Sequence, residues 1–429
     1  MALLIKNGRV LNPDPDPEMR MDAVSDLLVE NGVIVKAAPD IQVEGAQVLD
    51  ASGCFVMPGF IDLHVHLRDP GLERKETVVT GVAAAARGGF TTIVAMPNTR
   101  PVVDNADIVN YVHNKAKSEE KTNVLQAGAI TKGMAGKELS DIANMVRAGS
   151  PAISEDGKSV MDSYLLKRAM LIAKELDIPV LSHCEDISLV HGGVVNDDAN
   201  AKKRDLPGIS NAVEDIIAIR DVMLAKETGA RLHLCHCSTS GSVSIVKMAK
   251  EMGISVTAEV CPHHFTLTSD DMPKDDTNYK MNPPLRTRED VEALRQGLRD
   301  GVMDVISTDH APHTKEEKND SMLRAPFGIV GLETAAALTY TQLVLGGYLT
   351  PMQMAEKMSY NPAQVIRCGK GSLSPKSAAD IVVFDPNKVY TIKADEFASK
   401  GRNTPFDGWE VTGAVRATVA GGRVIYQER

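Results

Sequence analysis

Short apolar runs alternate with helical patterns through the middle of this 429-residue chain. Strands apolar on both faces, separated by amphipathic helices, are typical of a parallel sheet that helices cover on the outside. Eight such units predict an α/β fold in the form of a (β/α)8 TIM-type barrel. The expected strands are 59–66, 91–96, 123–129, 151–155, 179–183, 231–237, 254–261 and 304–309, and the clearest helices are 76–87, 104–118, 162–175, 212–228 and 240–251.

An open, doubly wound sheet is the competing architecture for alternating strands and helices. Such a sheet that binds a nucleotide needs a glycine-rich phosphate turn between an early strand and its helix. No G-x-G-x-x-G pattern opens a helix in this sequence. The barrel is therefore the preferred prediction.

The two ends of the chain have a different character, with short strands joined by turns and no long helical pattern. Neither end carries enough apolar residues for a stable core of its own. We expect residues 1–57 and 372–429 to form one small β-sandwich domain, and residues 58–371 to form the catalytic barrel. The expected flanking strands are 3–6, 26–30, 33–36 and 47–50, then 380–385, 411–420 and 423–426, with a hairpin turn at 421–422.

Charge and cysteine content narrow the class of protein. A formal net charge of −10 argues against nucleic acid or an anionic membrane as the main partner. No apolar run is long enough to span a bilayer, and the first residues lack a signal-peptide pattern, so we expect a cytoplasmic protein. The six cysteines include no C-x2-C pair, which is the usual spacing of structural zinc sites. We expect reduced, buried thiols.

Residues 58–70, Pro-Gly-Phe-Ile-Asp-Leu-His-Val-His-Leu-Arg-Asp-Pro, carry the strongest chemical signal. Side chains alternate along a strand, so Phe60, Asp62, His64 and His66 are expected on one face. Imidazole is the commonest protein ligand of zinc, and two on one strand face form half of a metal site. Arg68 continues the same parity and places a cation beside that site.

Polar residues also follow most of the other predicted strands, where a barrel keeps its active site. A zinc site that keeps an open position has three protein ligands, and these residues supply more than one metal can use. Two metals that share a strand-4 carboxylate and a bridging hydroxide account for them better. The candidates are His64, His66, Glu155 or Asp156, His183, His236 and Asp309, with Asn98, His263, His264, His310 and His313 nearby.

Two roles follow from residue chemistry at this expected centre. Asp309 could bind a metal, take a proton from the attacking hydroxide and pass it to a leaving nitrogen. A planar guanidinium at Arg68 beside the amide of Asn98 suits a bidentate substrate carboxylate, with His313 as a third donor. Neutral imidazoles with few carboxylates favour zinc, which manganese or cobalt could replace.

Several motifs together resemble the dihydroorotase family of the amidohydrolase superfamily, most of all its long bacterial form. The histidine and aspartate pattern is specific only to the superfamily, whereas Arg68, Asn98 and the 307–313 motif narrow it to the family. The resemblance covers nearly the whole chain. The motifs are residues 58–70, Ala-Met-Pro-Asn-Thr at 95–99, Cys-Pro-His-His at 261–264, Met-Asn-Pro-Pro-Leu-Arg at 281–286, Ser-Thr-Asp-His-Ala-Pro-His at 307–313 and Ala-Pro-Phe-Gly-Ile-Val-Gly-Leu-Glu at 325–333.

This resemblance implies reversible cyclisation of N-carbamoyl-L-aspartate to L-dihydroorotate in pyrimidine biosynthesis, with two Zn²⁺ per chain. His64 and His66 would bind one metal, His183 and His236 the other, with Asp156 as bridge and Asp309 as ligand and general acid/base. Residues 150–157 lack the carboxylated lysine that many superfamily members use as bridge. The implied substrate contacts are His66, Arg68, Asn98, Asn282, His313, Phe327 and Gly328.

The resemblance also implies a mobile loop at 315–325, a homodimer, and a possible complex with aspartate transcarbamoylase. Two alternatives stay open. A hydantoinase or allantoinase would open another cyclic amide, but it needs no carboxylate clamp and normally bridges with lysine. A dihydroorotase-like partner subunit of aspartate transcarbamoylase would have lost its metal ligands, whereas all six expected ligands are present here.

Overall fold

The computed structural model describes residues 2–274 and 276–428. Its central feature is a ring of parallel strands that matches the predicted barrel. Strands β6 to β8 pair in order, and β9, β10, β11, β14, β15 and β16 form the other part of the ring. The barrel strands are β6 (Phe60–Val65), β7 (Phe90–Ala95), β8 (Asn123–Gln126), β9 (Gly128–Ala129), β10 (Ile153–Ser154), β11 (Val180–Ser182), β14 (Leu232–Leu234), β15 (Val256–Val260) and β16 (Val305–Ile306).

Two contacts join these parts into a closed barrel. Only Ala127 separates β8 from β9, and its N–H donates to Ala95 O, so the two pieces act as one strand. At the other seam Val65 pairs in parallel with His310, and His66 N–H donates to His310 O at 2.8 Å. The expected fold class is therefore confirmed.

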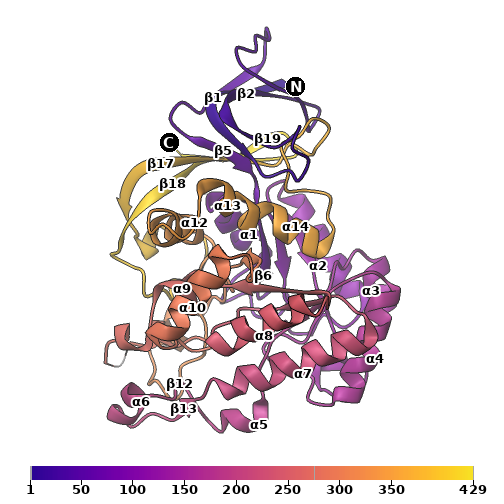
Figure 1. The fold of residues 1–429 in the computed structure, drawn as a ribbon, viewed down its shortest axis with the longest axis vertical. Helices are drawn as coiled ribbons and strands as arrows, with labels where there is room; N and C mark the ends of the chain where they lie inside the picture. Colours follow the sequence, from indigo (N-terminus) through magenta and orange to yellow (C-terminus); the bar gives the residue numbers. More distant parts are fainter. Residues whose placement is uncertain (1, 275, 429) are drawn as a thin grey trace.

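Helices follow the barrel strands and cover the ring from outside (Figure 1). Their limits agree with the predicted ones, because local capping sets them: Thr77 caps α1 with a capping box, and Gly229 ends α7 in the left-handed conformation. The long helices are α1 (Val78–Arg87), α2 (Ala106–Ser118), α4 (Ser163–Glu175), α7 (Ala212–Thr228), α8 (Ser240–Glu251) and α10 (Arg288–Arg299). The shorter ones are α3 (Ile142–Arg147), α5 (Ile187–Val190), α6 (Ala199–Lys203), α9 (Pro262–Thr266), α11 (Lys315–Lys318), α12 (Ala335–Thr339), α13 (Pro351–Ala355) and α14 (Asn361–Ile366), and β12 (Val195–Asn196) pairs with β13 (Gly208–Ile209) between α5 and α7.

The expected strict alternation along β6 is wrong. Ile61 and Leu63 pack in a cluster with residues of the other barrel strands, whereas Val65 and Leu67 pack with the helix side of the barrel. The register of β6 against β7 shifts between Asp62 and Val65. The Asp62 carboxylate lies at this irregularity, where it accepts the His64 N–H at 3.0 Å and the Thr308 hydroxyl at 2.6 Å.

The N-terminal and C-terminal segments together form one eight-stranded sheet, which lies above the barrel in Figure 1. Strand β5 joins the two ends, because it pairs with β1 on one side and with β17 on the other. The sheet packs on a hydrophobic cluster of its own. Its strands are β1 (Ala2–Asn12), β2 (Met21–Glu30), β3 (Val33–Ala38), β4 (Gln47–Asp50), β5 (Phe55–Pro58), β17 (Ile381–Thr391), β18 (Glu410–Ala420) and β19 (Arg423–Gln427).

Sequence analysis misses β5 because its apolar residues run into those of β6. The hairpin turn is confirmed: Gly421 and Gly422 have positive φ and join paired Ala420 and Arg423. The exact limits of the two domains stay a prediction.

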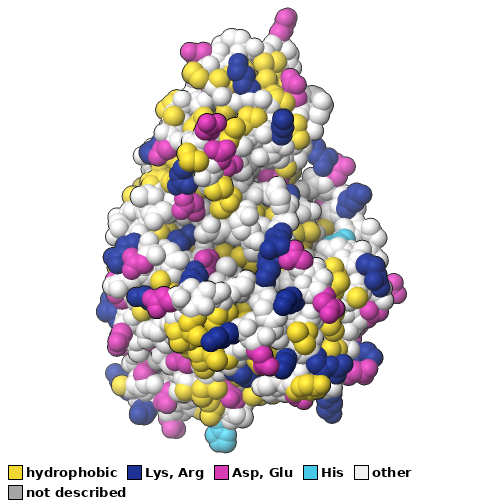
Figure 2. All heavy atoms as spheres, turned by 45° about the vertical axis from the view of Figure 1, so that its right-hand side comes forward, with side chains coloured by type: hydrophobic (Ala, Val, Ile, Leu, Met, Phe, Trp, Pro, Cys, Tyr) yellow, Lys and Arg dark blue, Asp and Glu magenta, His cyan; other side chains and the backbone are white. Residues whose placement is uncertain are grey.

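Charged side chains of both signs are mixed on the surface (Figure 2). Figure 2 shows basic and acidic side chains interspersed over one face, without a continuous basic stripe on that face. None of the helices in the described residues is long and apolar enough to cross a bilayer.

Candidate active site

Six potential metal ligands meet at the carboxyl ends of the barrel strands. All six side chains are buried, and each follows or ends a different strand except the pair on β6. Two overlapping groups place ligand atoms within 4.8 Å of one another: His64 with Asp156 and His236, and His64 with His66 and Asp309. The six predicted ligands that come together are His64, His66, Asp156, His183, His236 and Asp309.

Asp156 lies in the middle of this group. Its Oδ1 is 3.1 Å from His64 Nε2, 3.3 Å from His183 Nδ1 and 3.4 Å from His236 Nε2. Its Oδ2 lies 3.4 Å from His66 Nε2. Asp156 thus lies near all four histidines, with Oδ1 facing three of them and Oδ2 the fourth, which is the position expected of a carboxylate that two cations would share.

Glu155, the other candidate for this role, and Lys158, the next lysine along the chain, point elsewhere. The Glu155 carboxylate accepts the Thr131 N–H at 2.9 Å, and the Lys158 ammonium donates to Met134 O at 3.0 Å. Asp156 is therefore the strand-4 residue that faces the histidines.

On the side away from Asp156, the His64 and His183 rings bond to carboxylates. These bonds leave the ring nitrogen that faces Asp156 with a free lone pair. His64 Nδ1 lies 3.0 Å from Glu259 Oε1, and His183 Nε2 lies 3.1 Å from Glu185 Oε2. A carboxylate can only accept, so these nitrogens carry the protons and the opposite ring nitrogens are free to bind a cation. Histidine ligands of metals characteristically have such partners.

Unpartnered atoms test whether this set fits a metal. His64 Nε2 and His236 Nδ1 are buried without a hydrogen-bond partner; although Asp156 Oδ1 is near His64 Nε2, the approach lacks hydrogen-bond geometry. His183 Nδ1 and His236 Nε2 also lie only 2.9 Å apart. Converging nitrogens and carboxylate oxygens with unmet bonding capacity fit divalent cations of the zinc class.

The carboxylates in this group are held ionised. Burial alone would raise the pKa of Asp309, but the imidazoles beside it, His66 first, lower it to about 2. For Asp156 the same competition, with His64 as the strongest neighbour, holds the pKa well below its usual range. Both side chains are therefore bases at neutral pH.

Arg68 and His313 lie side by side at one side of the pocket, where the Arg68 guanidinium carries the positive charge. Arg68 is buried, its Nε donates to Pro312 O at 3.3 Å, and its Nη2 lies 3.4 Å from His313 Nε2. No carboxylate in the described residues comes within 4.0 Å of this guanidinium. A buried, unpaired guanidinium is costly unless an anion binds it.

His313 is fixed as a neutral imidazole. Its Nε2–H donates to Phe327 O at 2.8 Å, and Lys75 Nζ donates to its Nδ1 at 3.1 Å. Burial, with Arg68 and Lys75 nearby, lowers its pKa to about 2. The imidazole can therefore position its neighbours but adds no charge.

Two of the predicted substrate contacts, Asn98 and Asn282, also bond to the histidines or to their partners. Asn98 Oδ1 lies 2.9 Å from His66 Nδ1, so it receives that proton and leaves Nε2 facing Asp309. Asn282 Nδ2 donates to Glu185 Oε1 at 2.8 Å, and Glu185 in turn holds His183.

The segment with Phe327 and Gly328 closes one side of the pocket. A side chain at Gly328 would meet Ala311 O at 2.7 Å, and its φ of 145° strains any other residue. Lys318 is buried and donates to the carbonyl groups of Lys280, Pro326 and Gly328, at 3.1 Å each. The stretch 315–325, expected to be a mobile loop, thus contains helix α11 and an anchored lysine.

Three residues of this site have left-handed backbone conformations that non-glycine residues rarely adopt. The φ angles are 61° at Arg68, 33° at His236 and 48° at Asp309. Such strain is typical of functional sites, where the surrounding fold holds it in place.

Sequence reasoning missed Glu259 and Glu185. Glu259 sits in the buried strand β15, where its Oε1 faces His64 and its Oε2 lies 3.1 Å from His233. A carboxylate inside an otherwise apolar parallel strand was a usable signal. Glu185, two residues after His183, had no comparable signal.

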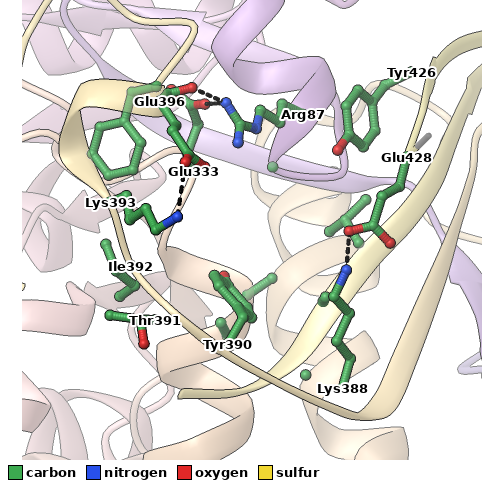
Figure 3. Close-up of a pocket in the computed structure, with 17 residues that line it drawn as sticks. Arg87, Glu333, Lys388, Tyr390, Thr391, Ile392, Lys393, Glu396, Tyr426 and Glu428 are labelled. Atoms are coloured by element: carbon green, nitrogen blue, oxygen red, sulfur yellow. Dashed lines mark hydrogen bonds and ion pairs between the residues drawn. The ribbon is translucent and has the colours of Figure 1, made fainter. Parts of the chain in front are cut away.

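A separate cavity of about 440 Å³ lies outside the barrel, beside the β-domain. Figure 3 shows Tyr390 and Tyr426 at this cavity with several charged side chains. The charges are paired within the protein: Lys388 with Glu428, Lys393 with Glu396 at 3.1 Å, and Arg87 with Glu333 at 3.4 Å. None of the predicted site residues lines it.

Comparison with known proteins agrees with this geometry. A family model described as dihydro-orotase-like matches residues 53–242. The dihydroorotase of Pelotomaculum thermopropionicum is 48% identical over 429 residues, which is 100% of this chain and 99% of the relative. The dihydroorotase of Geobacter metallireducens is 47% identical over 428 residues, covering 100% of both chains.

Solved structures show the same architecture. The L-hydantoinase of Arthrobacter aurescens is 26% identical and superposes with a TM-score of 0.86 over 99% of this chain and 96% of its own. A D-hydantoinase of Thermus sp., also 26% identical, gives a TM-score of 0.82 over 99% and 95% of the two chains. The full-length relatives at 47–48% identity show that the chain belongs to the dihydroorotase family.

Proposed function

We propose that this chain is a dihydroorotase, which interconverts N-carbamoyl-L-aspartate and L-dihydroorotate in pyrimidine biosynthesis. One observation carries the choice of substrate: Arg68 is buried beside the candidate metal centre, and no carboxylate of the described residues lies within 4.0 Å of its guanidinium. L-Dihydroorotate brings the carboxylate that a planar guanidinium binds in a bidentate manner. Hydantoin and allantoin carry no such group. Relatives at 44–48% identity that are named dihydroorotase support the same choice.

His64 and His66 would hold one cation and His183 and His236 the other, with Asp156 between them and Asp309 on the first. Zn²⁺ is the proposed ion, with Mn²⁺ or Co²⁺ as substitutes. When bound, the two cations supply Lewis acidity that lowers the pKa of water and polarises a carbonyl group. Glu259, Asn98 and Glu185 keep three of the imidazoles in the tautomer that ligation requires.

Asp309 is the proposed general acid/base. Its low pKa keeps the carboxylate ionised, so Oδ1 can accept the proton of the water that attacks the ring amide carbon. As the bond from that carbon to the ring nitrogen breaks, Asp309 returns the proton to the nitrogen, giving N-carbamoyl-L-aspartate. The reverse sequence closes the ring and releases water.

Arg68, Asn98 and His313 would hold the substrate in place, together with His66, Asn282, Phe327 and Gly328. Arg68 would bind the substrate carboxylate, which fixes the ring relative to Asp309. The Phe327 carbonyl fixes the His313 ring beside Arg68.

The decisive experiment measures turnover of L-dihydroorotate, hydantoin and allantoin by one metal-replete sample with known metal content. Preferred turnover of L-dihydroorotate that is lost on chelation and restored by Zn²⁺ supports the proposal. Preference for hydantoin or allantoin would keep the barrel chemistry and refute the substrate. Full activity without metal would refute the metal centre.

Three further expectations belong to this proposal: a homodimer, association with aspartate transcarbamoylase, and a cytoplasmic location. Light scattering of the purified chain tests the first, where a monomeric mass would contradict it. Co-purification from the native host tests the second.

A further inference from the structure

A second group of potential ligands lies beside the candidate active site and takes no part in it. Cys261, His263 and His264 follow β15, the two histidines being in the short helix α9. All three side chains are buried, and they can place ligand atoms within 4.8 Å of one another. Thiolate and imidazole are the ligands that zinc prefers.

The proton arrangement of His264 leaves a lone pair without a partner. Its Nε2 lies 2.9 Å from Pro283 O, and a carbonyl can only accept, so Nε2 carries the proton. Nδ1 is then an acceptor, yet it is buried and has no donor. A histidine that gives one N–H to a backbone carbonyl and keeps the other nitrogen free is the usual form of a metal ligand.

His263 also has a ring nitrogen without a partner. Its Nε2 is also buried without a hydrogen-bond partner, and its ring lies 4.2 Å from that of His264 between centroids. Burial, with His264 nearby, holds the pKa of His263 well below its usual range, and burial lowers that of His264 to about 4. Both rings are therefore neutral and able to bind a cation without first losing a proton.

Another cluster of the same kind is already satisfied. His64, Cys235 and Glu259 also place ligand atoms within 4.8 Å of one another. There, however, His64 Nδ1 bonds to Glu259 at 3.0 Å, and His233 bonds to the second Glu259 oxygen at 3.1 Å. In the group of Cys261, His263 and His264, by contrast, His263 Nε2 and His264 Nδ1 have no hydrogen-bond partner in the described residues.

We propose that Cys261, His263 and His264 bind a further thiophilic divalent cation of the zinc class. Three protein ligands leave one open position, as in zinc sites that keep a water ligand. The Cys261 thiol would lose its proton on binding. The ion would tie the end of β15 to Pro283, next to the proposed substrate contact Asn282. This site is separate from the Asp156 centre and independent of which cyclic amide the chain opens.

Cobalt titration tests the site by spectroscopy. Metal-depleted full-length protein is titrated with Co²⁺, and bound cobalt and near-ultraviolet absorption are followed together. Thiolate ligation gives a sulfur-to-cobalt charge-transfer band that the Asp156 centre, which has only imidazole and carboxylate ligands, does not produce. We expect about three Co²⁺ per chain, with the band appearing for one of them.

Matched variants assign the band. Cys261→Ser should lose the band and one cobalt, whereas Cys235→Ser and Cys184→Ser, which remove other buried thiols near the histidines, should retain both. His264→Gln keeps a donor for Pro283 O but lacks the Nδ1 ligand, so it too should lose the third cobalt, even if Cys261→Ser folds poorly. Saturation at two cobalt ions without the band, or a band that Cys235→Ser or Cys184→Ser abolishes and Cys261→Ser retains, would overturn the proposal.

Discussion

Charged side chains gather both at the carboxyl ends of the barrel strands and at the cavity beside the β-domain. The two regions differ in whether these side chains have partners within the protein. At the cavity Lys388 and Glu428 pair within the protein, as do Lys393 and Glu396. At the strand ends, among the residues that the structure describes, the buried Arg68 guanidinium has no carboxylate within 4.0 Å and His64 Nε2 has no hydrogen-bond partner. The cavity beside the β-domain has a volume of about 440 Å³, but its charged side chains already have partners. Unmet bonding capacity marks the functional site instead, because a ligand must supply what the fold leaves out.

We expect the largest difference in kcat between Asp309→Asn, at the strand ends, and Glu428→Gln, at the cavity. The amide cannot accept a proton, so we expect kcat for L-dihydroorotate to fall roughly 10³-fold or more, since proton transfer contributes about 10²–10⁴-fold and ligation is also weakened. Glu428→Gln removes a carboxylate that is paired at the cavity and should leave kcat within about twofold, as surface pairs contribute little. Steady-state kinetics measures kcat of both variants. Comparable losses of kcat would show that the strand ends and the cavity do not differ in function.

Arg68→Met against Arg87→Met compares an unpaired with a paired arginine. Loss of a buried charged contact costs about 2–5 kcal/mol, so we expect KM for L-dihydroorotate to rise by roughly 10²-fold or more. Metal content should be unchanged, because Arg68 is not a proposed ligand. Arg87→Met should change neither quantity. A normal KM in Arg68→Met would remove Arg68 from the substrate pocket.

Glu259→Gln tests the support behind the metal ligands. The amide cannot serve both His64 and His233 as the carboxylate does, so zinc affinity should fall about 10–100-fold. Competition with a chromogenic chelator measures this affinity. Glu333→Gln alters another carboxylate, one at the cavity, and should leave metal affinity as it is; equal weakening in both variants would point to a general loss of structure.

Tyr390→Phe tests the cavity by its effect on stability. Burial raises the pKa of Tyr390 to about 12, above its ordinary value of 10.0. The folded state therefore holds this proton more tightly, a stabilisation that is complete below pH 10.0 and is lost as pH rises toward about 12. We expect the unfolding free energy of the wild type to fall by up to about 2 kcal/mol more than that of Tyr390→Phe across this range. Tyr164→Phe, at an exposed tyrosine, is the control. Denaturant titrations at several pH values measure the unfolding free energy. The same fall with pH in the wild type and both variants would contradict the assignment.

Much of the fold could be predicted because hydrophobic period and capping are local properties. Helix α7 spans the predicted residues 212–228, and the eight barrel strands occur where apolar runs were found. The strands themselves are shorter than predicted: β16 covers only Val305–Ile306, because the chain beyond it turns to bond with Asp62 and to place Asp309.

The site was predictable by residue type and less so by arrangement. Positions after strand ends identified the histidines, since a barrel brings those ends together whatever the loops do. The partners that fix their tautomers, such as Glu185 behind His183, depend on side-chain directions set by tertiary packing. For the same reason the register shift in β6 broke the expected alternation, while His64 and His66 stayed neighbours.

The ratio of kcat/KM for L-dihydroorotate to that for hydantoin, measured in wild type and Arg68→Met at equal metal content, tests the central claim most directly. We expect a wild-type ratio far above one that falls by roughly 10²-fold in Arg68→Met, mainly through KM for L-dihydroorotate. A ratio near or below one in the wild type, or a ratio that Arg68→Met leaves unchanged, would contradict it.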